Sequence, residues 1–497
     1  MEKKRRALFA CFQGLLIILM TVLVFCMVAQ IDNLQGTARV LNYAGLVRGA
    51  TQREIKLEIV GQEDDDLIAY LDEITYGLRN GSRKYGLVQL PDEKYLTDLD
   101  KQIAVWQQLK EEIYRVRQEG YAATDIVDVS EKYFRMADQT VFAAEEYSQS
   151  IADTIRSLEY ATVADVTLLI VIMIIQTAEA VGLDAVGFIP CRTFHELEVF
   201  YTNRQKQNLQ NEFEEQNIEK RINPNFYMEK GKTIISIAFP YYDEEDEKIQ
   251  SNGFSIYTKR LDYHRVVKKY LDQVCEYIEA LGGEAISLVD SNSLPERYIA
   301  YLAGIGFIGR NNMVITKKYG SYVFLGEIIT DLEIECQDQR CFEELATYKE
   351  CGDCDHCIHE CPTKSINKKR INPNICLSYM TQKKDLSDKE IQLLKGNVFG
   401  CDFCQLQCPY NEKIEKISLE EFKMLEHMND EVAIYAGMDN KYFKEKIAPT
   451  SCGWRGKNVI RRNALIHMSR EGHDIEAFRG DSPYINEYID RLNKLKK

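Results

Sequence analysis

Two stretches of this chain decide its fold: CGDCDHCIHECP at residues 351–362 and CDFCQLQCP at residues 401–409. The first places its cysteines as C-x2-C-x2-C-x3-C-P, and the second as C-x2-C-x3-C-P. Cysteines at two-residue intervals, followed by Cys-Pro, bind a [4Fe–4S] cluster, and the last cysteine ligates a neighbouring cluster. Together with Cys376, which lies between the stretches, they supply the eight thiolates that two such clusters require.

We predict that these thiolates form two sets of four. One set is Cys351, Cys354, Cys357 and Cys408, and the other is Cys361, Cys376, Cys401 and Cys404. Structural zinc and disulfides are the alternatives. Zinc sites favour paired C-x2-C knuckles, which the first run does not resemble, and disulfides require an oxidising compartment. The sequence therefore indicates a protein that transfers electrons, with this region in a reducing cytosol.

The composition is that of a globular protein with several domains. The 497 residues are 45% hydrophobic and 28% charged, and this length predicts about two to four domains. The formal charge of −15 and the isoelectric point near 5.2 argue against a general affinity for nucleic acid. They leave room for a local basic patch.

The N-terminus has the pattern of a membrane anchor over residues 1–30. EKKRR at residues 2–6 precedes an uncharged apolar run at residues 7–29, which is long enough to span a bilayer. The basic cluster predicts that the N-terminus lies in the cytoplasm. A cleaved signal peptide is the alternative, but its apolar core would be shorter and would end in small residues.

Residues 31–160 predict an all-α extracytoplasmic bundle. Apolar residues recur at helical spacing, and Asn80-Gly81 and Leu90-Pro91 predict breaks between helices. The region resembles the sensor regions of bacterial receptors and histidine kinases, although a plain spacer bundle fits equally well.

A second apolar run at residues 162–175 predicts a marginal second transmembrane helix over residues 161–176. Asp165 lies near its start, and the uninterrupted part is short for a span. A buried helix is the alternative. A second span would return the cysteine-rich region to the cytosol.

The remainder carries the motifs of a known family. The most specific block is VDSNSLPERYIAYLAGIGFIGRNNMVITKKYGSYVFLGEIITD at residues 289–331, and GWRGK at residues 453–457 and RRNAL at residues 461–465 follow the cysteine runs. From about residue 174 to about residue 470, some three-fifths of its length, the chain resembles the epoxyqueuosine reductases.

This resemblance implies a cobalamin-dependent reduction that is part of tRNA modification. Such enzymes convert the epoxide of epoxyqueuosine, at the wobble position of the anticodon, to the alkene of queuosine. The two clusters would pass single electrons to the corrinoid, from a low-potential donor of the flavodoxin or ferredoxin type.

Asp290 is the candidate proton donor. It ends the apolar run at residues 285–289, which reads as a strand. An apolar pocket at a strand end would raise the pKa of the carboxyl and keep it protonated, as a general acid requires. Its position matches the proton donor of the family. The alternative is an aspartate that caps the turn after the strand.

The resemblance also implies residues that line the corrinoid. These are Arg221, Ser255, Val314, Thr316, Leu325 and Ser378. Arg221 in a surface ion pair and Ser378 as a turn cap are the alternatives. Glycines at Gly304, Gly306 and Gly320 would allow close backbone approach to the ring, and His264 is expected to be a packed core histidine.

The expected tRNA contacts lie mostly in the basic tail. Residues 441–497 hold 13 lysines and arginines against 7 acidic residues. Cations bind phosphate, and indole or guanidinium planes stack on exposed bases. The segment mixes Trp454 with cations that include Arg462. The predicted contacts are Lys384, next to Lys383, with Arg455, Lys457 and Arg461.

The expected fold class behind the anchor and bundle is an α/β corrinoid- and substrate-binding domain over residues 177–340. Its strands are predicted near residues 232–239, 285–289 and 322–328. A loop-rich ferredoxin-like module with two [4Fe–4S] clusters follows over residues 341–420, and a helical tRNA-contacting tail over residues 421–497.

Two other functions remain open from the sequence. One is a different corrinoid iron–sulfur reductase, similar to the reductive dehalogenases. The other is a non-enzymatic membrane redox sensor. The chain departs from the family at Arg310, where lysine is usual, and in its N-terminal 176 residues, which have no counterpart there.

Overall fold

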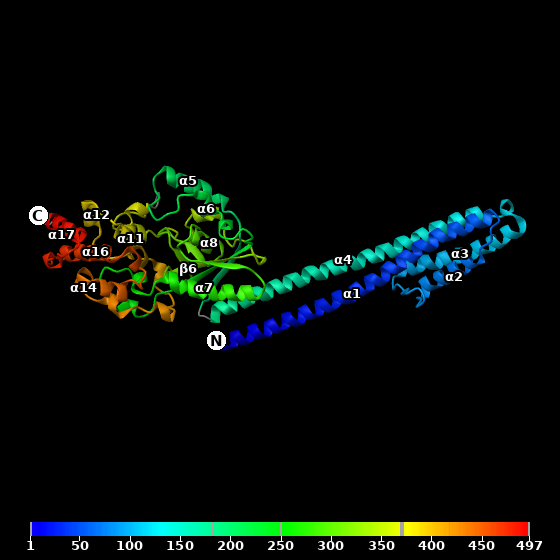
Figure 1. The fold of residues 1–497 in the computed structure, drawn as a ribbon, viewed down its shortest axis with the longest axis horizontal. Helices are drawn as coiled ribbons and strands as arrows, with labels where there is room; N and C mark the ends of the chain where they lie inside the picture. The colour runs from blue at the N-terminus through cyan, green and yellow to red at the C-terminus, as the bar shows by residue number, and fades with distance from the viewer. Residues whose placement is uncertain (1, 181–182, 249–250, 368–371, 417, 496–497) are drawn as a thin grey trace. The chain divides into compact units, whose positions relative to one another are not determined.

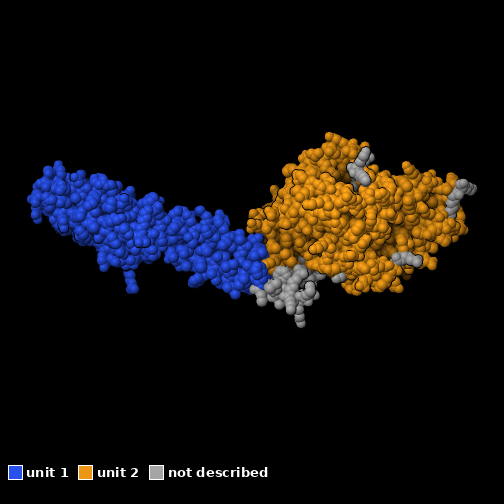
Figure 2. All heavy atoms as spheres, turned by 180° about the vertical axis from the view of Figure 1, so that it is seen from behind, with its two compact units in different colours: residues 1–170 blue, residues 171–497 orange. Residues whose placement is uncertain are grey.

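A computed structural model describes residues 2–180, 183–248, 251–367, 372–416 and 418–495. The chain divides into two compact units, Met1–Ile170 and Val171–Lys497, which Figure 2 colours separately. The first unit is entirely helical in its described part. The second contains the sheet, the cysteine runs and the C-terminal helices.

The first unit is built on two long helices that enclose two shorter ones. The helices are α1 (Glu2–Ile59), α2 (Asp65–Asn80), α3 (Glu93–Glu119) and α4 (Ile126–Ala180). Figure 1 shows α2 and α3 beside the ends of α1 and α4 that their connecting segments join. The breaks fall where Asn80-Gly81 and Leu90-Pro91 predict them, so the expected all-α unit is confirmed.

Local side-chain chemistry fixes the two short helices. Asp64 and Asp92 cap α2 and α3 by accepting hydrogen bonds from backbone N–H groups at 3.0 and 2.7 Å. Trp106 is buried in the core and donates its indole N–H to Asp72 at 2.7 Å. Lys110 binds the same carboxylate at 2.8 Å.

The apolar runs are the ends of these long helices rather than separate elements. The segments at residues 12–59 and 126–175 are long and apolar enough to cross a membrane, by length and composition. No glycine or proline interrupts residues 126–180, so α4 continues through the expected junction near residue 160. Likewise α1 passes through residue 30 without a break.

The second unit contains a four-stranded antiparallel sheet with the order β1-β2-β6-β3. The strands are β1 (Ala185–Pro190), β2 (Thr233–Pro240), β3 (Ala285–Leu288) and β6 (Val323–Thr330). The three strands predicted from sequence are therefore confirmed to within about two residues. Every residue of β2 is buried, in keeping with its largely apolar sequence, TIISIAFP.

Two helices cover the opposite faces of this sheet. Gly326 of β6 faces α7 (Tyr263–Ala280), where an added Cβ would lie 2.7 Å from the Val267 side chain. Side chains alternate along a strand, and Ile329 accordingly packs with Tyr298 of α8 (Glu296–Leu302). Glu327 shares the α8 face with Ile329.

Short elements connect the sheet to the C-terminal part. They are α5 (Glu198–Lys206), α6 (Ile218–Ile222), β4 (Gly306–Ile308), β5 (Val314–Thr316), α9 (Phe342–Leu345), α10 (His356–Glu360), α11 (Leu377–Gln382), α12 (Asp388–Leu393) and α13 (Phe403–Leu406). The last helices are α14 (Val432–Gly437), α15 (Asn440–Tyr442), α16 (Lys457–Arg470) and α17 (Pro483–Leu495).

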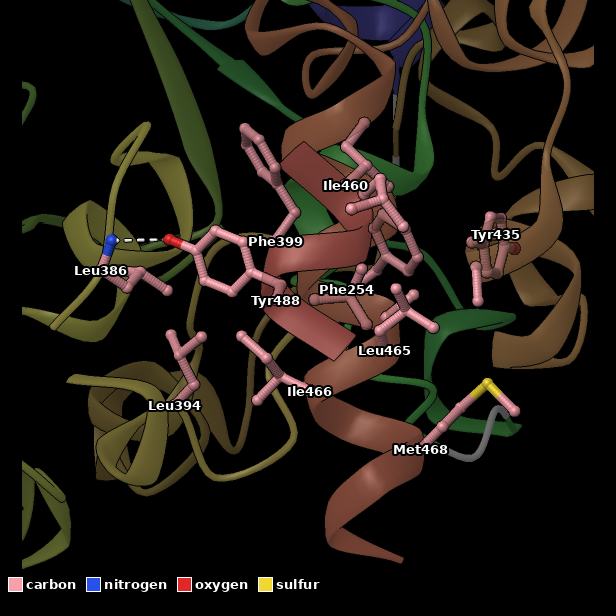
Figure 3. Packing of buried hydrophobic residues seen from close by; sticks show 14 of the residues in the cluster. Phe254, Leu386, Leu394, Phe399, Tyr435, Ile460, Leu465, Ile466, Met468 and Tyr488 are labelled. Atoms are coloured by element: carbon pink, nitrogen blue, oxygen red, sulfur yellow. Dashed lines mark hydrogen bonds between the residues drawn. The ribbon is translucent and has the colours of Figure 1, made fainter. Parts of the chain in front are cut away.

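A single apolar core binds the C-terminal helices to the cysteine-rich region. Figure 3 shows Tyr488 of α17 among Leu394 and Ile466, where its hydroxyl accepts the Leu386 N–H at 2.8 Å. On α16, Arg462 is fully buried and donates to the carbonyl oxygens of Lys383 and Lys384 at 2.8 and 2.7 Å. The expectation that Arg462 is a surface cation is therefore wrong.

Candidate functional site

The thiols of the cysteine runs influence one another in two groups. Burial, followed by the charges of Cys351, Cys408 and Cys354, raises the pKa of Cys357 to about 11. Burial likewise raises the pKa of Cys401 to about 12, with Cys376 and Cys361 among its charged neighbours.

Cys404 joins the second group and touches the first. Burial raises the pKa of Cys404 well above its usual value, followed by the charges of Cys401, Cys376 and Cys357. These neighbours are the two sets named from the sequence, placed side by side. The assignment of each cysteine to a cluster stays a prediction.

The chemistry of these thiols fits iron–sulfur clusters. All fourteen described cysteines are free thiols, so no disulfide competes for them. Within the described ranges, no group of three or more His, Cys, Asp or Glu side chains is arranged to hold a single metal ion. Each thiol raises the pKa of its neighbours, and iron would remove that penalty by stabilising the thiolates. A cluster shares its cationic charge among four thiolates.

Asp402 joins the cysteine-rich region to the sheet. Its buried carboxylate accepts the Ser255 hydroxyl at 2.5 Å and the Ile256 N–H at 2.8 Å. Gly400 permits this contact, because an added Cβ would lie 2.5 Å from the Ser255 Cβ. Ser255, a predicted corrinoid residue, therefore lies on the boundary between the sheet and the cysteine-rich region.

The other predicted corrinoid residues near the sheet are mostly buried. Val314 and Thr316 lie on β5, and the Thr316 hydroxyl donates to the Gly320 carbonyl at 3.1 Å. Leu325 lies on β6 beside Ala238. Ser378 is in α11, where its carbonyl accepts two side-chain hydrogen bonds.

The glycines expected to approach the corrinoid serve the packing of the chain itself. An added Cβ at Gly306 would lie 2.5 Å from the Ile315 carbonyl oxygen, and one at Gly320 would lie 2.0 Å from an Asn411 side-chain oxygen. At Gly304, the nearest atoms belong to Gln339, at 3.2 Å. The described structure accounts for all three without a ligand.

Asp290 lies at the end of β3 in a polar setting. Its carboxylate accepts the Tyr263 hydroxyl and lies 3.4 Å from His264 Nε2. Partial burial alone would raise the pKa of Asp290, but the contacts with His264 and Tyr263 outweigh it and lower the pKa. The expected raised pKa is wrong, because the side chain is 55% exposed and faces a cation and a hydroxyl rather than apolar groups.

His264 carries the proton that the sequence analysis placed on Asp290. Burial by itself would lower its pKa, but hydrogen bonds to Asp262 and Asp290 raise the pKa to about 9. Its Nδ1 lies 2.8 Å from Asp262. His264 is therefore a half-buried cation at neutral pH, and the expectation of a core histidine is wrong.

A cavity of about 630 Å³ opens beside Asp290. Its lining comprises Phe213, Glu214, Glu215, Gln216, Lys220, Phe226, Tyr227, Asp290, Ser291, Asn292 and Ser293. None of the six predicted corrinoid residues is among them. Arg221 instead pairs with Glu214 at 2.9 Å and lies over the Tyr201 ring, so the ion-pair alternative describes it.

The lining of this cavity combines exposed aromatic rings with polar and charged side chains. Phe213 and Phe226 expose 41% and 56% of their surface, as apolar groups at ligand sites do. Burial raises the pKa of the nearby Tyr257, and the charges of Cys452, Asp402, Asp290 and Cys376 raise it further in the same direction.

The predicted tRNA residues divide into exposed and structural ones. Trp454 is 57% exposed, and Arg455 lies over its ring at 4.8 Å and over the Phe213 ring at 5.2 Å. Lys384 is exposed and Lys457 is partly exposed. Arg461 instead donates to the Ala436 carbonyl at 2.8 Å, and this hydrogen bond links α16 to α14.

Several residues of this site were not expected from the sequence. Tyr263 lies in the segment Asp262-Tyr263-His264, which resembles the family but was given no role, and Phe213 carries no motif. Two glutamates could have been noticed in the sequence. Glu327 lies inside the apolar strand at residues 323–330 and Glu296 lies at a helix start, and glutamates are rarely buried.

The fold and these sites are those of an oxidoreductase that combines an α/β domain with a cysteine-rich iron–sulfur domain. Residues 350–411 match the family described as "4Fe-4S double cluster binding domain", and residues 221–291 match "Epoxyqueuosine reductase QueG, DUF1730".

Individual relatives agree with both matches. The epoxyqueuosine reductase of Lactococcus garvieae is 32% identical over 301 residues, which cover 59% of this chain and 84% of the relative. The chain belongs to the epoxyqueuosine reductase family, the oxidoreductases of tRNA queuosine biosynthesis. The resemblance seen in the sequence is confirmed.

Solved structures of the family share the fold of the second unit. The Streptococcus thermophilus epoxyqueuosine reductase is 32% identical with a TM-score of 0.58, covering 65% of this chain and 90% of that protein. An epoxyqueuosine reductase bound to an epoxyqueuosine-modified tRNA-Tyr stem loop is 28% identical with a TM-score of 0.59. That match covers 66% of this chain and 91% of the other.

Replacing a cysteine of one set is expected to remove one cluster. Cys376→Ala should lower the iron content from about eight to about four atoms per chain, because a cluster without its fourth thiolate is lost. Cys341→Ala is the matched control, since Cys341 is exposed and outside both sets. Iron analysis of anaerobically reconstituted protein measures this, and unchanged iron in Cys376→Ala would contradict the assignment.

Proposed function

We propose that this chain reduces epoxyqueuosine in tRNA to queuosine, with cobalamin as cofactor and two [4Fe–4S] clusters as the electron relay. The observation that carries the proposal is the group of Asp290, His264 and Tyr263 at the edge of a cavity, in the same unit as the cysteine-rich region. Family membership supports the substrate, and the double-cluster match supports the relay.

The reaction sets clear demands on the site. Converting an epoxide to an alkene breaks both carbon–oxygen bonds of the ring and releases the oxygen as water. The balance requires two electrons and two protons. Each cluster passes one electron at a time, and a low-potential donor of the flavodoxin or ferredoxin type would supply them. The cavity must therefore receive electrons from one side and protons from another.

Asp290 and His264 would supply the proton as a pair. The proton resides on His264, and Asp290 stands between this cation and the cavity. When bound substrate excludes water, charge on the leaving oxygen draws the proton across Asp290. Tyr263 fixes the carboxylate by its hydroxyl. A proton would thus reach the leaving oxygen through Asp290, although the pKa of Asp290 is not raised.

Cobalamin would supply a reduced cobalt centre, a strong nucleophile that can open an epoxide. Ser255, Val314, Thr316, Leu325 and Ser378 would hold it along the boundary between the sheet and the cysteine-rich region. Arg221 would have to leave Glu214 to take part. The exposed rings of Phe213 and Phe226 would exclude water from the cavity.

The tRNA would be held by an aromatic and basic surface next to the cavity. The Phe213 and Trp454 rings lie 5.4 Å apart, edge to face, with Arg455 over both. Exposed rings and guanidinium planes are the groups on which unstacked RNA bases stack. Lys384 and Lys457 would contact phosphates. A member of the family binds a tRNA stem loop, which supports this partner.

The long helices would anchor the chain in the cell membrane. Phe25 and Ile18 of α1 expose 75% and 63% of their surface. Exposed apolar side chains of this kind are more stable in lipid than in water. The basic cluster at residues 2–6 would keep the N-terminus in the cytoplasm. With α1 and α4 both spanning, the second unit would also lie in the cytoplasm and the α2–α3 region outside.

Removing the proton path is expected to abolish turnover without removing cofactors. In anaerobic protein reconstituted with iron, sulfide and cobalamin, Asp290→Ala should lower kcat by about 10²- to 10⁴-fold. Mass analysis of nucleosides from digested tRNA measures the loss of one oxygen. Asp272→Asn is the matched control, because its carboxylate pairs with Lys268 on α7.

The pH dependence separates this mechanism from a protonated aspartate acting alone. Because His264 has a raised pKa of about 9, activity should fall as the pH rises through about 9. His264→Gln should lose this limb. Activity in Asp290→Ala equal to that of the parent would contradict the proposal, and reduction of halogenated substrates without tRNA turnover would favour the dehalogenase-like alternative.

The aromatic surface predicts a specific loss of RNA affinity. Trp454→Ala should weaken binding of an epoxyqueuosine-modified stem loop by about 5- to 150-fold, since stacking of one base is worth about 1–3 kcal/mol. Trp454→Phe keeps a ring and should retain most of the affinity. Filter binding measures both, and equal affinities in all three proteins would refute the contact.

Membrane anchoring predicts the behaviour of the full chain in cell fractions. The parent should remain with membranes after alkaline carbonate washing. Ile18→Lys with Phe25→Lys should release it, because each buried charge costs about 2.5–3.5 kcal/mol at a helix centre. Leu281→Lys, at an exposed position of the second unit, is the control. A parent chain found in the soluble fraction would rule out the anchor.

A further inference from the structure

A buried glutamate lies beneath the loop that carries Asp290. Glu327 is on β6, its side chain is fully buried, and neither carboxyl oxygen has a hydrogen-bond partner among the described residues. In the sheet register it lies opposite Ser236 of β2. An ionised carboxylate without donors would be very costly here. Glu327 must therefore hold a proton.

Its acidic neighbour is Glu296, the first residue of α8. Glu296 Oε1 accepts the backbone N–H of Asp290 at 2.5 Å and the Asn292 side-chain amide at 2.6 Å. One carboxylate oxygen thus accepts hydrogen bonds from two residues of the loop at 290–293. These contacts are made to the loop itself and leave the Asp290 carboxylate free for Tyr263 and His264.

The loop needs such support, because Asp290 has a strained backbone. Its φ is +46°, in the left-handed region that side chains other than glycine seldom adopt. This conformation costs about 1–2 kcal/mol and persists only where neighbouring groups hold it. The Glu296 carboxylate is the acceptor that satisfies the Asp290 N–H in this conformation.

Two adjacent carboxyl groups in a buried site cannot both be ionised. The groups facing Glu296 are Glu327 from β6, Asp290 and Asn292 from the loop, and Tyr263 from α7. Burial, followed by the charge of Asp290, raises the pKa of Glu296 to about 7, and burial raises that of Glu327 much further. Near neutrality one proton therefore stays on Glu327 while Glu296 ionises.

We infer that Glu296 is a positioning residue for the proton donor, and that Glu327 supports it as a neutral acid beneath the loop. Glu327 stays neutral near Glu296, whose carboxylate holds the loop that carries Asp290 to the cavity. This inference rests on the proposed role of Asp290. It assigns no contact with substrate to either glutamate.

The two glutamates should respond differently to substitution. Glu327→Gln keeps a neutral side chain of the same size near Glu296, so kcat should stay within about twofold of the parent. Glu296→Ala removes the acceptor for both loop donors, so kcat should fall by about 10- to 100-fold. KM for tRNA should change by less than about twofold in both variants, because the aromatic surface is untouched.

The test uses the full chain, reconstituted with clusters and cobalamin, with modified tRNA as substrate. Two readouts separate positioning from general damage. Hydrogen exchange of the peptide covering residues 289–295 should speed up in Glu296→Ala but not in Glu327→Gln. The parent kcat should rise as the pH increases through about 7, where Glu296 ionises, and Glu296→Gln should lack this rise. Iron content and Tm confirm that each variant folds.

The possible outcomes are distinct. If Glu296→Ala matches the parent in kcat and in loop exchange, the inference is overturned. If Glu327→Gln is as damaging as Glu296→Ala, a neutral supporting acid is excluded. If the parent itself does not convert the tRNA, the proposed function fails, while the exchange measurement still decides whether Glu296 holds the loop.

Discussion

The buried contact between Asp402 and the segment at residues 255–256 is the interaction on which the rest of the second unit depends. Asp402 follows Cys401 directly, so this contact places a thiol next to the segment between β2 and α7. Under the proposed function, the electron source and the proton donor would be held together by this one carboxylate, which is satisfied by two donors from the segment that follows β2.

Much of this arrangement could be predicted from sequence, because it rests on spacing and periodicity. The cysteine intervals indicate the clusters, and the apolar runs of β2, β3 and β6 indicate the sheet. The helix breaks of the first unit follow from Asn80-Gly81 and Leu90-Pro91. These are local signals, and no distant residue overrides them.

The electrostatics of the site could not be predicted in this way. The pKa of Asp290 depends on Tyr263 and His264, which are 27 and 26 residues away and reach it only because α7 packs on β3. The sequence shows a strand-end aspartate after an apolar run but not the cation that faces it. Arg462 is similar, since its burial depends on carbonyl groups about 80 residues away.

The distribution of charge explains why substrate binding and chemistry use different surfaces. Around the loop at 290–293, Asp290 and Glu296 are anionic near neutrality and His264 is the cation that faces them, so RNA phosphates gain little there. The basic excess lies instead in residues 441–497, within a chain of net charge −15. Under the proposed function, the tail would hold the polyanion and the cavity would accept the modified base. The acidic residues that would repel the RNA backbone also raise the pKa of His264, which would supply the proton for the reaction.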